Sequence, residues 1–179
     1  MPQALLIVDM LNDFVTGKFG FPGARRIVPR LRGLLEEWRR RGEPVVYVCD
    51  SHPPEDPEFN LWGPHALKGT EGAKVIPELE PRGGEKVVEK RRYSGFFGTE
   101  LERVLKEAGA EGVVLTGVLT DFCVLHTAAD AFFRGYGVTV VRDCVASTSQ
   151  KAHHWALKYM REAYGARVTS SHKLLGERK

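Results

Sequence analysis

The sequence predicts an α/β fold with three layers, in which a parallel β-sheet has helices on both faces. Two observations predict it. Short apolar runs, mostly of β-branched residues, alternate along the chain with longer segments of helical periodicity. The short runs are also continuously apolar, which is typical of strands that are buried on both faces of a sheet. Strands that alternate with helices in this way are typical of parallel sheets.

Six runs are expected to be strands because they are short and rich in β-branched residues. In chain order they are Ala4–Val8, Val45–Cys49, Val87–Val88 with its flanks, Val113–Thr116, Val138–Val141 and Ala166–Thr169. Helical spacing of apolar residues predicts four helices between them, over 24–42, 98–108, 122–135 and 150–164. In the second of these, Thr99 and Glu102 have the spacing of a capping box, which would begin the helix.

Residues 50–85 do not fit this alternation. The segment is rich in Pro, Gly, His and acidic residues, and it is long for a connection within a domain. Connections of this length are usually functional or disordered. We therefore expect a loop that contributes to a site.

The composition indicates one globular domain, over residues 1–179. Of the 179 residues, 42% are hydrophobic and 27% are charged. A net charge of +3 is too balanced to indicate nucleic-acid binding, and no apolar run is long enough for a membrane span. No signal peptide is visible, and three cysteines are an odd number, so we expect a reducing, cytoplasmic setting without disulfides.

Polar residues follow several of the predicted strands. Asp9, Asp50, Lys90 and Asp143 each lie at or just after a carboxyl end, and Gly117 follows another of the strands. In an open parallel sheet, ligands bind outside these ends. The alternative for any single aspartate is that it caps the next helix, because Asp is a favoured N-cap residue.

Cys123 is the candidate nucleophile. It ends the segment Gly117-Val-Leu-Thr-Asp-Phe-Cys123, between a predicted strand and a predicted helix. A helix N-terminus stabilises a thiolate, and the backbone N–H groups of such a turn can face a developing oxyanion. The alternative is a small buried apolar residue, as most free cysteines are. That alternative fits Cys49 and Cys144 better, because one lies inside a strand and the other just after one.

A cysteine hydrolase also needs a proton acceptor. Asp9 could carry the proton from the thiol to a leaving amine, and Lys90 could favour the ionised forms. His126 follows Cys123 by three residues, but on a helix it points along the same face rather than back to the sulfur. We interpret it as a structural histidine.

Three segments resemble the catalytic segments of the isochorismatase-like cysteine hydrolases. They are Ile7-Val-Asp-Met-Leu-Asn-Asp-Phe14, Glu89-Lys-Arg-Arg-Tyr-Ser-Gly-Phe96 and Gly117-Val-Leu-Thr-Asp-Phe-Cys123. The resemblance implies a six-stranded sheet of order 3-2-1-4-5-6 and a catalytic triad of Asp9, Lys90 and Cys123. It also implies an oxyanion hole made by the backbone amides of Leu119 and Cys123, with a cis peptide between Val118 and Leu119. Many relatives have a smaller residue in place of Leu119, so this pocket is expected to be narrower.

The loop after the second strand is a candidate metal site. Asp50 and His52 lie two residues apart, so on an extended backbone their side chains share one side. His65 returns after a Pro-rich stretch. A mixed set of His and carboxylate ligands suits Zn, Fe or Mn. The alternative is a polar loop whose histidines are hydrogen-bond donors.

The same loop is similar to that of nicotinamidases within the superfamily, which bind a divalent metal. Their motif resembles Pro64-His65-Ala-Leu-Lys-Gly69-Thr-Glu-Gly72. The resemblance implies one divalent ion, with zinc favoured over iron or manganese, held by Asp50, His52 and His65. Some nicotinamidases add a Glu seven residues before the last His, which implies Glu58 as a fourth ligand. Aromatics at matching positions imply that Phe14, Trp62 and Tyr93 line the substrate pocket.

The resemblance therefore implies a nicotinamidase, which also acts as a pyrazinamidase. It would hydrolyse nicotinamide to nicotinate and ammonia through a cysteine thioester, in the salvage of NAD, and homo-oligomers are common in the family. One alternative is a related amidohydrolase of a ureido or carbamoyl compound, which the metal loop disfavours. A second is a non-catalytic module that binds a small ligand, and no G-x-G-x-x-G follows the first strand to indicate a dinucleotide.

Overall fold

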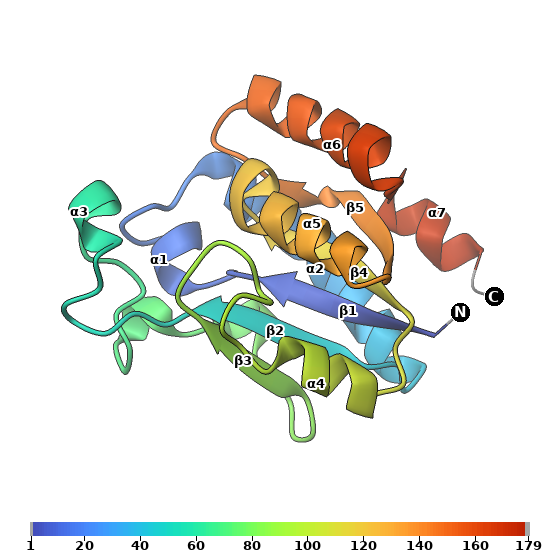
Figure 1. The fold of residues 1–179 in the computed structure, drawn as a ribbon, viewed down its shortest axis with the longest axis horizontal. Helices are drawn as coiled ribbons and strands as arrows, with labels where there is room; N and C mark the ends of the chain where they lie inside the picture. Colours follow the sequence, from blue (N-terminus) through green and yellow to red (C-terminus); the bar gives the residue numbers. More distant parts are fainter. Residues whose placement is uncertain (1, 178–179) are drawn as a thin grey trace.

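The structure is a computed structural model that describes residues 2–177, so both ends of the predicted domain, residue 1 and residues 178–179, lie outside the described residues. Six parallel strands form one sheet of order β3-β2-β1-β4-β5-β6 (Figure 1), which confirms the predicted topology. The strands are β1 (Gln3–Val8), β2 (Val45–Asp50), β3 (Lys86–Lys90), β4 (Gly112–Val118), β5 (Gly137–Ala146) and β6 (Arg167–Thr169).

The helices lie on both faces of this sheet. They are α1 (Asn12–Val15), α2 (Pro22–Arg40), α3 (Phe59–Trp62), α4 (Leu101–Glu107), α5 (Leu125–Phe133), α6 (Gln150–Tyr164) and α7 (Ser171–Gly176). A π-helical turn over Thr120–Val124 precedes α5, and two 3₁₀ turns, Glu71–Ala73 and Pro77–Leu79, lie in the long loop. Within residues 2–177 no helix is both long enough and apolar enough to cross a membrane.

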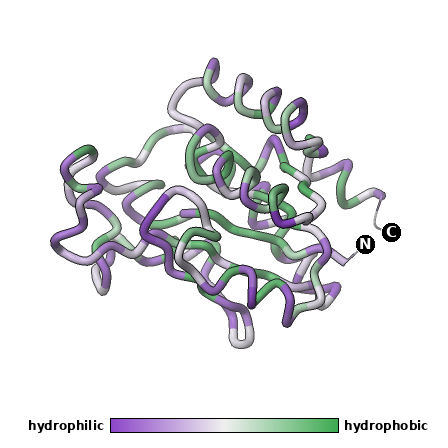
Figure 2. The backbone as a smooth tube through the Cα atoms, in the orientation of Figure 1, coloured by the Kyte–Doolittle hydropathy of each residue, from purple (hydrophilic) through white to green (hydrophobic). Residues whose placement is uncertain are grey.

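Alternation along β1 produces the three layers. Ala4, Leu6 and Val8 point into the core that α4, α5 and α6 cover, whereas Leu5 and Ile7 point into the core under α2 and α7. All five side chains are completely buried, so the strand reads as a continuous apolar run although its residues face opposite sides. The hydrophobic residues of the strands accordingly run through the middle of the molecule (Figure 2).

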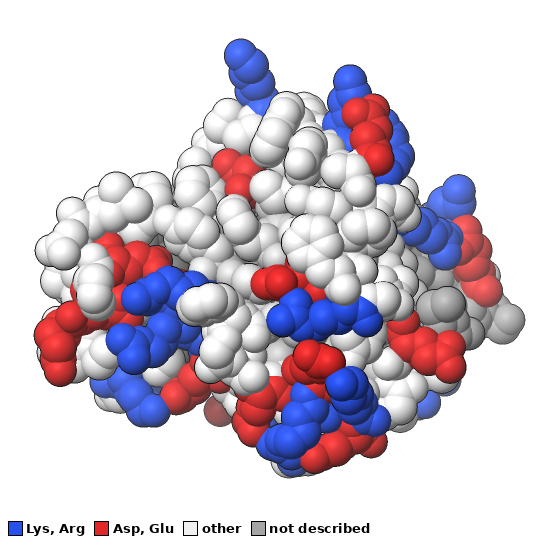
Figure 3. Space-filling model, viewed as in Figure 1, with Lys and Arg blue, Asp and Glu red and all other residues white. Residues whose placement is uncertain are grey.

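Two predictions about local structure are wrong. The capping box does not form: Thr99 accepts a hydrogen bond from the backbone N–H of Leu101, and the Glu102 carboxylate pairs with Lys106 and Arg134 instead. Lys106 on the next turn of α4 and Arg134 after α5 offer Glu102 stronger, charge-assisted partners than the backbone does. The ion pairs of α4 belong to a group of charged side chains that covers this part of the surface (Figure 3).

The fifth strand does not end near Val141. β5 continues to Ala146, with an irregularity in its pairing between Leu115 and Gly117 of β4. Asp143 therefore lies within the strand, where its carboxylate accepts hydrogen bonds from the backbone N–H and the hydroxyl of Ser171. It supports the start of α7 and is not at the carboxyl edge of the sheet.

The long loop 50–85 is ordered, and it packs against the carboxyl edge of the sheet. The backbone of His52 bridges to that of Leu67, and the backbone N–H of Ala66 donates to the Asp13 carboxylate (2.8 Å). Farther along, Tyr47 of β2 donates its hydroxyl hydrogen to the carbonyl of Leu79 (2.7 Å). These contacts hold the loop beside the ends of β1 and β2.

Candidate active site

Asp9 is turned out of β1 by a backbone conformation that is uncommon for a residue with a side chain. Its φ is +52°, in the left-handed region, where Asp is tolerated better than most residues. Its Oδ1 accepts a hydrogen bond from the backbone N–H of Asp50 (2.7 Å). The neighbouring strand permits this turn because it has Gly117, with φ +98°, beside Val8: a Cβ there would lie 1.9 Å from the carbonyl oxygen of Val8.

The ammonium group of Lys90 lies among three predicted site residues. Its Nζ is 2.9 Å from Asp9 Oδ2, donates to Asp50 Oδ1, and is 3.4 Å from Cys123 Sγ. A fourth contact is to the carbonyl of Arg92 (3.1 Å). The Lys90 side chain is completely buried. Burying an ammonium in this way is tolerable only because it is paired and fully hydrogen-bonded.

Cys123 lies in the π-helical turn that connects β4 to α5. The backbone N–H of Val124 donates to the carbonyl of Leu119 (3.2 Å), five residues earlier, and the peptide between Val118 and Leu119 is cis, as expected. Such turns occur frequently at functional sites. The ligand atoms of Asp9, Asp50 and Cys123 all lie within 4.8 Å of one another, so the carboxylate of Asp9 is close to the sulfur.

The electrostatics of this cluster favour a protonated thiol at rest. Burial raises the pKa of Cys123 well above its usual range; Lys90 opposes this rise, and the Asp9 and Asp50 carboxylates add to it. Burial also raises the pKa of Asp9 to about 6, with the Asp50 charge in support and Lys90 opposing. Burial therefore outweighs the charge of Lys90, which favours the thiolate. A nearby proton acceptor is required.

The structure brings Asp50, His52 and His65 together next to this cluster. Their ligand atoms lie within 4.8 Å of one another, and all three residues are buried. The Nδ1 atom of His65 contacts the carbonyl of Gly63 (2.8 Å), which leaves its Nε2 on the side of Glu58. The Nε2 atom of His52 is buried, and among the described residues it has no hydrogen-bond partner; Asp50 Oδ2 lies 3.6 Å away.

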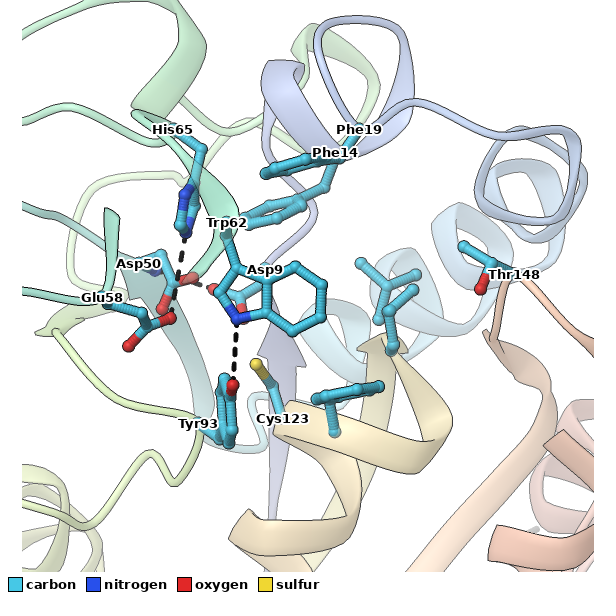
Figure 4. Close-up of a pocket in the computed structure, with 13 residues that line it drawn as sticks. Asp9, Phe14, Phe19, Asp50, Glu58, Trp62, His65, Tyr93, Cys123 and Thr148 are labelled. Carbon is cyan, nitrogen blue, oxygen red and sulfur yellow. Dashed lines mark hydrogen bonds and ion pairs between the residues drawn. The ribbon is translucent and has the colours of Figure 1, made fainter. Parts of the chain in front are cut away.

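These residues fit a divalent metal ion. An unpartnered buried imidazole nitrogen is costly unless it binds something, and two imidazoles with a carboxylate are ligands that suit zinc. Glu58, the predicted fourth ligand, lies close by: its Oε1 is 4.0 Å from Nε2 of His65, and its side chain is largely buried. Glu58 points into the site rather than to solvent (Figure 4).

Asp56 belongs to the same site, although the sequence did not single it out. Its completely buried carboxylate contacts Nδ1 of His52 (3.1 Å), Nε of Arg91 (3.1 Å) and Nη1 of Arg92 (3.0 Å). Burial acts to raise its pKa, but the hydrogen bonds from the Glu58 backbone and these side chains outweigh it and lower the pKa. The carboxylate is therefore ionised. The richness of the loop in acidic residues was the only signal for it.

A cavity of about 230 Å³ opens above the sulfur. The three predicted aromatics line it: Phe14 from α1, Trp62 from α3, and Tyr93 after β3 (Figure 4). Trp62 donates its indole N–H to the hydroxyl of Tyr93 (3.0 Å) across the site. Other lining residues were not predicted from the sequence: Phe19, Val118, Phe122 and Thr148.

The sequence held a signal for some of these lining residues and none for others. Phe122 packs edge-on against Trp62 and Tyr93, with ring centroids 5.8 and 5.4 Å apart, and its place beside Cys123 was a signal. Thr148 follows β5, and it was missed because that strand was predicted to end near Val141. Nothing in the pattern around Phe19 indicates the cavity. His126 contacts the carbonyl of Phe122 through Nδ1 (2.8 Å) and the ring of Tyr93 (centroids 5.3 Å apart), and it is not among the lining residues.

The family of this chain is established by comparing its sequence with models of known protein families. The model of the isochorismatase domain matches residues 3–173, nearly the whole chain. The chain belongs to the isochorismatase family. Like other isochorismatase-family chains, it has the sheet order β3-β2-β1-β4-β5-β6 expected from its motifs.

Three solved structures of the isochorismatase fold are particularly similar. N-carbamoylsarcosine amidase from Thermoplasma acidophilum is 45% identical, with a TM-score of 0.90 over 96% of this chain and 97% of that one. Nicotinamidase PncA from Bacillus subtilis is 35% identical, with a TM-score of 0.89 over 95% and 100%. Pyrazinamidase of Pyrococcus horikoshii in complex with zinc is 29% identical, with a TM-score of 0.88 over 95% and 99%.

Proposed function

We propose that this isochorismatase-family amidohydrolase is a nicotinamidase that converts nicotinamide and water to nicotinate and ammonia. The observation that carries the proposal is the lining of the cavity. Five of its 13 lining residues are aromatic (Phe14, Phe19, Trp62, Tyr93 and Phe122), and no Lys or Arg is found among the described residues that line it. A flat, neutral heteroaromatic amide suits such walls. Nicotinate formed here would serve the salvage of NAD, as the resemblance implies.

Charge argues against the principal alternative. N-carbamoylsarcosine carries a carboxylate, and the acidic residues in the lining are Asp9, Asp50 and Glu58. A substrate carboxylate bound here would need the proposed metal ion as its cationic partner, because the ammonium of Lys90 is already paired with Asp9 and Asp50. The 45% identity to N-carbamoylsarcosine amidase nevertheless makes a carbamoyl amide the second candidate, and it is therefore the competitor in the test below.

The proposed chemistry begins at the sulfur. Cys123 attacks the carboxamide carbon while Asp9 accepts the thiol proton, and the backbone amides of Leu119 and Cys123 donate to the oxygen that becomes negative. Asp9 then gives the proton to the leaving nitrogen, which departs as ammonia and leaves a thioester. A water molecule, deprotonated by Asp9, hydrolyses the thioester and restores the thiol.

Lys90 balances the charges during these steps. Its ammonium contacts both carboxylates and the sulfur, so it stabilises whichever group is anionic at each stage. No other cation in the described chain is placed at this distance from all three. Lys90 also keeps Asp9 from sharing a proton with Asp50, which would remove the base.

Asp50, His52, His65 and Glu58 are the residues that we propose would hold one zinc ion. When bound, it would attract the ring nitrogen of the substrate and so orient the carboxamide toward the sulfur. The aromatic side chains restrict the plane of the ring. The structure of a zinc complex of a pyrazinamidase that is 29% identical supports zinc as the metal.

The test is ammonia release from four amides at matched concentrations: nicotinamide, pyrazinamide, N-carbamoylsarcosine and an aliphatic amide of similar size. We expect kcat/KM to be highest for nicotinamide, with pyrazinamide close to it, and we expect Trp62→Ala to lower the nicotinamide value roughly 5- to 100-fold. Leu61→Ala, a neighbouring exposed residue of α3, is the control. Higher efficiency with N-carbamoylsarcosine would replace nicotinamidase by the second candidate, and leave the thioester chemistry standing.

A further inference from the structure

We propose that Asp56 is a positioning residue for the metal site, which orients His52 by accepting a hydrogen bond from its Nδ1 atom. The inference rests on the proposed metal site, and it goes further because it gives a role to a residue outside the ligand set. It also states which nitrogen of His52 carries the hydrogen. Four contacts of one buried carboxylate support it.

The hydrogen bond between Asp56 and His52 indicates which nitrogen of the imidazole carries the hydrogen. Asp56 Oδ2 lies 3.1 Å from Nδ1 of His52, and neither side chain is exposed. The Asp56 oxygens also face two guanidinium groups, of Arg91 and Arg92, and the backbone N–H of Glu58, which can only donate, so the carboxylate acts as an acceptor here and Nδ1 of His52 carries the hydrogen. The Nε2 atom of the neutral ring is then an acceptor with a free lone pair. This is the nitrogen that has no hydrogen-bond partner among the described residues.

The contact with Asp56 also determines where the Nε2 atom of His52 points. With Nδ1 held by Asp56, the Nε2 atom lies on the side of Asp50, whose Oδ2 is 3.6 Å away, and of the His65 ring, whose centroid is 4.7 Å from that of His52. A ring rotated by half a turn would direct Nε2 away from this group. A carboxylate partner also makes a ligating imidazole more basic, and such partners commonly strengthen metal binding.

His65 provides an internal comparison. Its Nδ1 is held by the carbonyl of Gly63 (2.8 Å), a neutral acceptor two residues away on the same short loop. Local backbone is therefore sufficient to orient His65. His52 is held instead by a buried charged group, the Asp56 carboxylate. Burying that charge is costly unless other contacts stabilise it.

The two arginines after β3 stabilise the buried Asp56 carboxylate. Arg91 and Arg92 both contact the Asp56 carboxylate, and Arg92 Nη1 also lies 3.6 Å from Oε2 of Glu58. The carbonyl of Arg92 accepts from Lys90. Asp56 thus joins the metal loop to the segment that carries the catalytic lysine. A role limited to folding would not require this carboxylate to contact His52.

Zinc affinity is the first measurement. Competition with a chromogenic chelator gives the zinc Kd of the wild-type chain and of Asp56→Ala, for which we expect a Kd roughly 10- to 100-fold higher. Asp56→Asn keeps one acceptor oxygen and should fall between the two. Asp143→Ala is the matched control, because Asp143 also accepts two hydrogen bonds (both 2.8 Å) but lies outside the site. Unchanged zinc affinity in folded Asp56→Ala would overturn the inference.

The second measurement begins with the wild-type chain and so does not depend on the folding of a variant. Nitrogen-15 NMR of the histidine rings in the metal-free wild-type chain, at a pH where imidazoles are neutral, should show the His52 hydrogen on Nδ1. In Asp56→Ala, the His52 signals should change tautomer population while those of His65 stay the same. A wild-type His52 with its hydrogen on Nε2 would contradict the inference even if every Asp56 variant failed to fold.

The outcomes also separate this inference from the proposed function. A wild-type chain that binds no zinc would reject the metal site and the inference together. A chain that hydrolyses nicotinamide and binds zinc equally well with and without Asp56 would reject the inference alone. Loss of zinc affinity in Asp56→Ala, in a wild type that prefers N-carbamoylsarcosine, would support the inference and reject the nicotinamidase.

Discussion

Single residues at the centre of the site depend on one another for their protonation. Lys90 is the one cation in contact with two carboxylates and a thiol among the described residues, and all of these groups are buried. Burial disfavours every charge in the cluster, so each ionised group persists only through its partner. Changing one of them therefore alters the protonation of the others.

We expect Cys123→Ala to lower kcat by roughly 10³-fold or more with nicotinamide, because the proposed nucleophile is removed. Substrate binding, measured by calorimetry, should persist. Cys49→Ala and Cys144→Ala serve as controls, since these cysteines are also free and buried but lie outside the cavity lining. Activity of Cys123→Ala within tenfold of wild type would exclude a thioester mechanism.

The activity should be lost in acid through protonation of Asp9. The group must be ionised to accept the thiol proton, and burial, supported by the Asp50 charge, raises its pKa to about 6. Below that pH the base is protonated, so we expect kcat/KM to fall as pH decreases through about 6. A profile measured from about pH 4 to about pH 8 checks this. A fall centred near pH 4 would mean that an ordinary, solvated carboxyl group controls the reaction.

The residues of the site were predictable to different degrees. Asp9, Lys90 and Cys123 lie in segments whose residue types and order are distinctive, so the sequence was sufficient to place them together. Asp56 and Phe19 were not predictable, because the path of a loop brings each to the site: Asp56 contacts His52, four residues earlier, and Phe19 packs against Phe14 and His65. The positions of loops, unlike those of strand ends, do not follow from periodicity.

Among the elements, α2 packs on the sheet through its apolar face, and Arg39 near its C-terminus adds a set of polar contacts. Arg39 contacts both oxygens of Glu85 (2.7 and 2.8 Å), the hydroxyl of Tyr47 (3.0 Å) and the carbonyl of Glu80 (2.9 Å). The Arg39 and Glu85 side chains are 10% and 12% exposed, so this pair is screened less than the surface pairs of α4. The contacts hold the end of the long loop before β3.

We expect Glu85→Gln to lower the free energy of unfolding by roughly 1.5–3 kcal/mol at pH 7. Burial acts to raise the pKa of Glu85, but the Arg39 hydrogen bonds and the backbone of Arg82 outweigh it and lower the pKa. A carboxyl group with a lowered pKa in the folded state stabilises above its unfolded pKa, and this contribution is lost as pH falls through the folded pKa.

The difference between wild type and Glu85→Gln, measured by urea unfolding, should therefore shrink as the pH is lowered below about 4.5, the unperturbed value. Glu107→Gln, which removes an exposed ion pair with Arg103, should change stability by less than about 0.5 kcal/mol at any pH. A pH-independent difference for Glu85→Gln would show that packing, not charge, is what was lost.

Sequence patterns predicted the existence of the elements better than their ends. The helices α2, α4, α5 and α6 and the six strands were found because hydrophobic periodicity reports which face is buried, whereas the short helices α1, α3 and α7 were not predicted. The end of β5 was missed because Arg142 and Asp143 are polar residues inside a strand, accommodated by an irregular pairing with β4. The capping box failed because stronger charged partners were available to Glu102.

At the scale of the whole molecule, the sheet gathers the site from segments that are far apart in the chain. Parallel strands end at one edge, so the turns after β1, β2, β3 and β4 meet there. Whether residues 1–179 unfold as one unit, and whether copies of the chain associate, stay predictions. Urea unfolding followed by two probes and analytical ultracentrifugation would test them.

Zinc should stabilise the entire fold if the proposed site binds it. At a free concentration of about a hundred times Kd, a ligand specific for the folded state adds about 2.7 kcal/mol. For a chain of this size that corresponds to a rise in Tm of roughly 5–10 °C. Calorimetry with zinc and with a chelator tests this, and His65→Ala should abolish the difference. Equal Tm values in wild type would argue against a metal site.

Gly117 shows how a position without any reactive atom can be indispensable. A single methyl group there would overlap the carbonyl oxygen of Val8, since the two atoms would lie only 1.9 Å apart. Strands β1 and β4 would have to separate, and the two partners of the proposed proton transfer, Asp9 and Cys123, follow these strands. A genetic screen for loss of function should therefore recover substitutions at this glycine, although it has no side chain that could take part in the reaction.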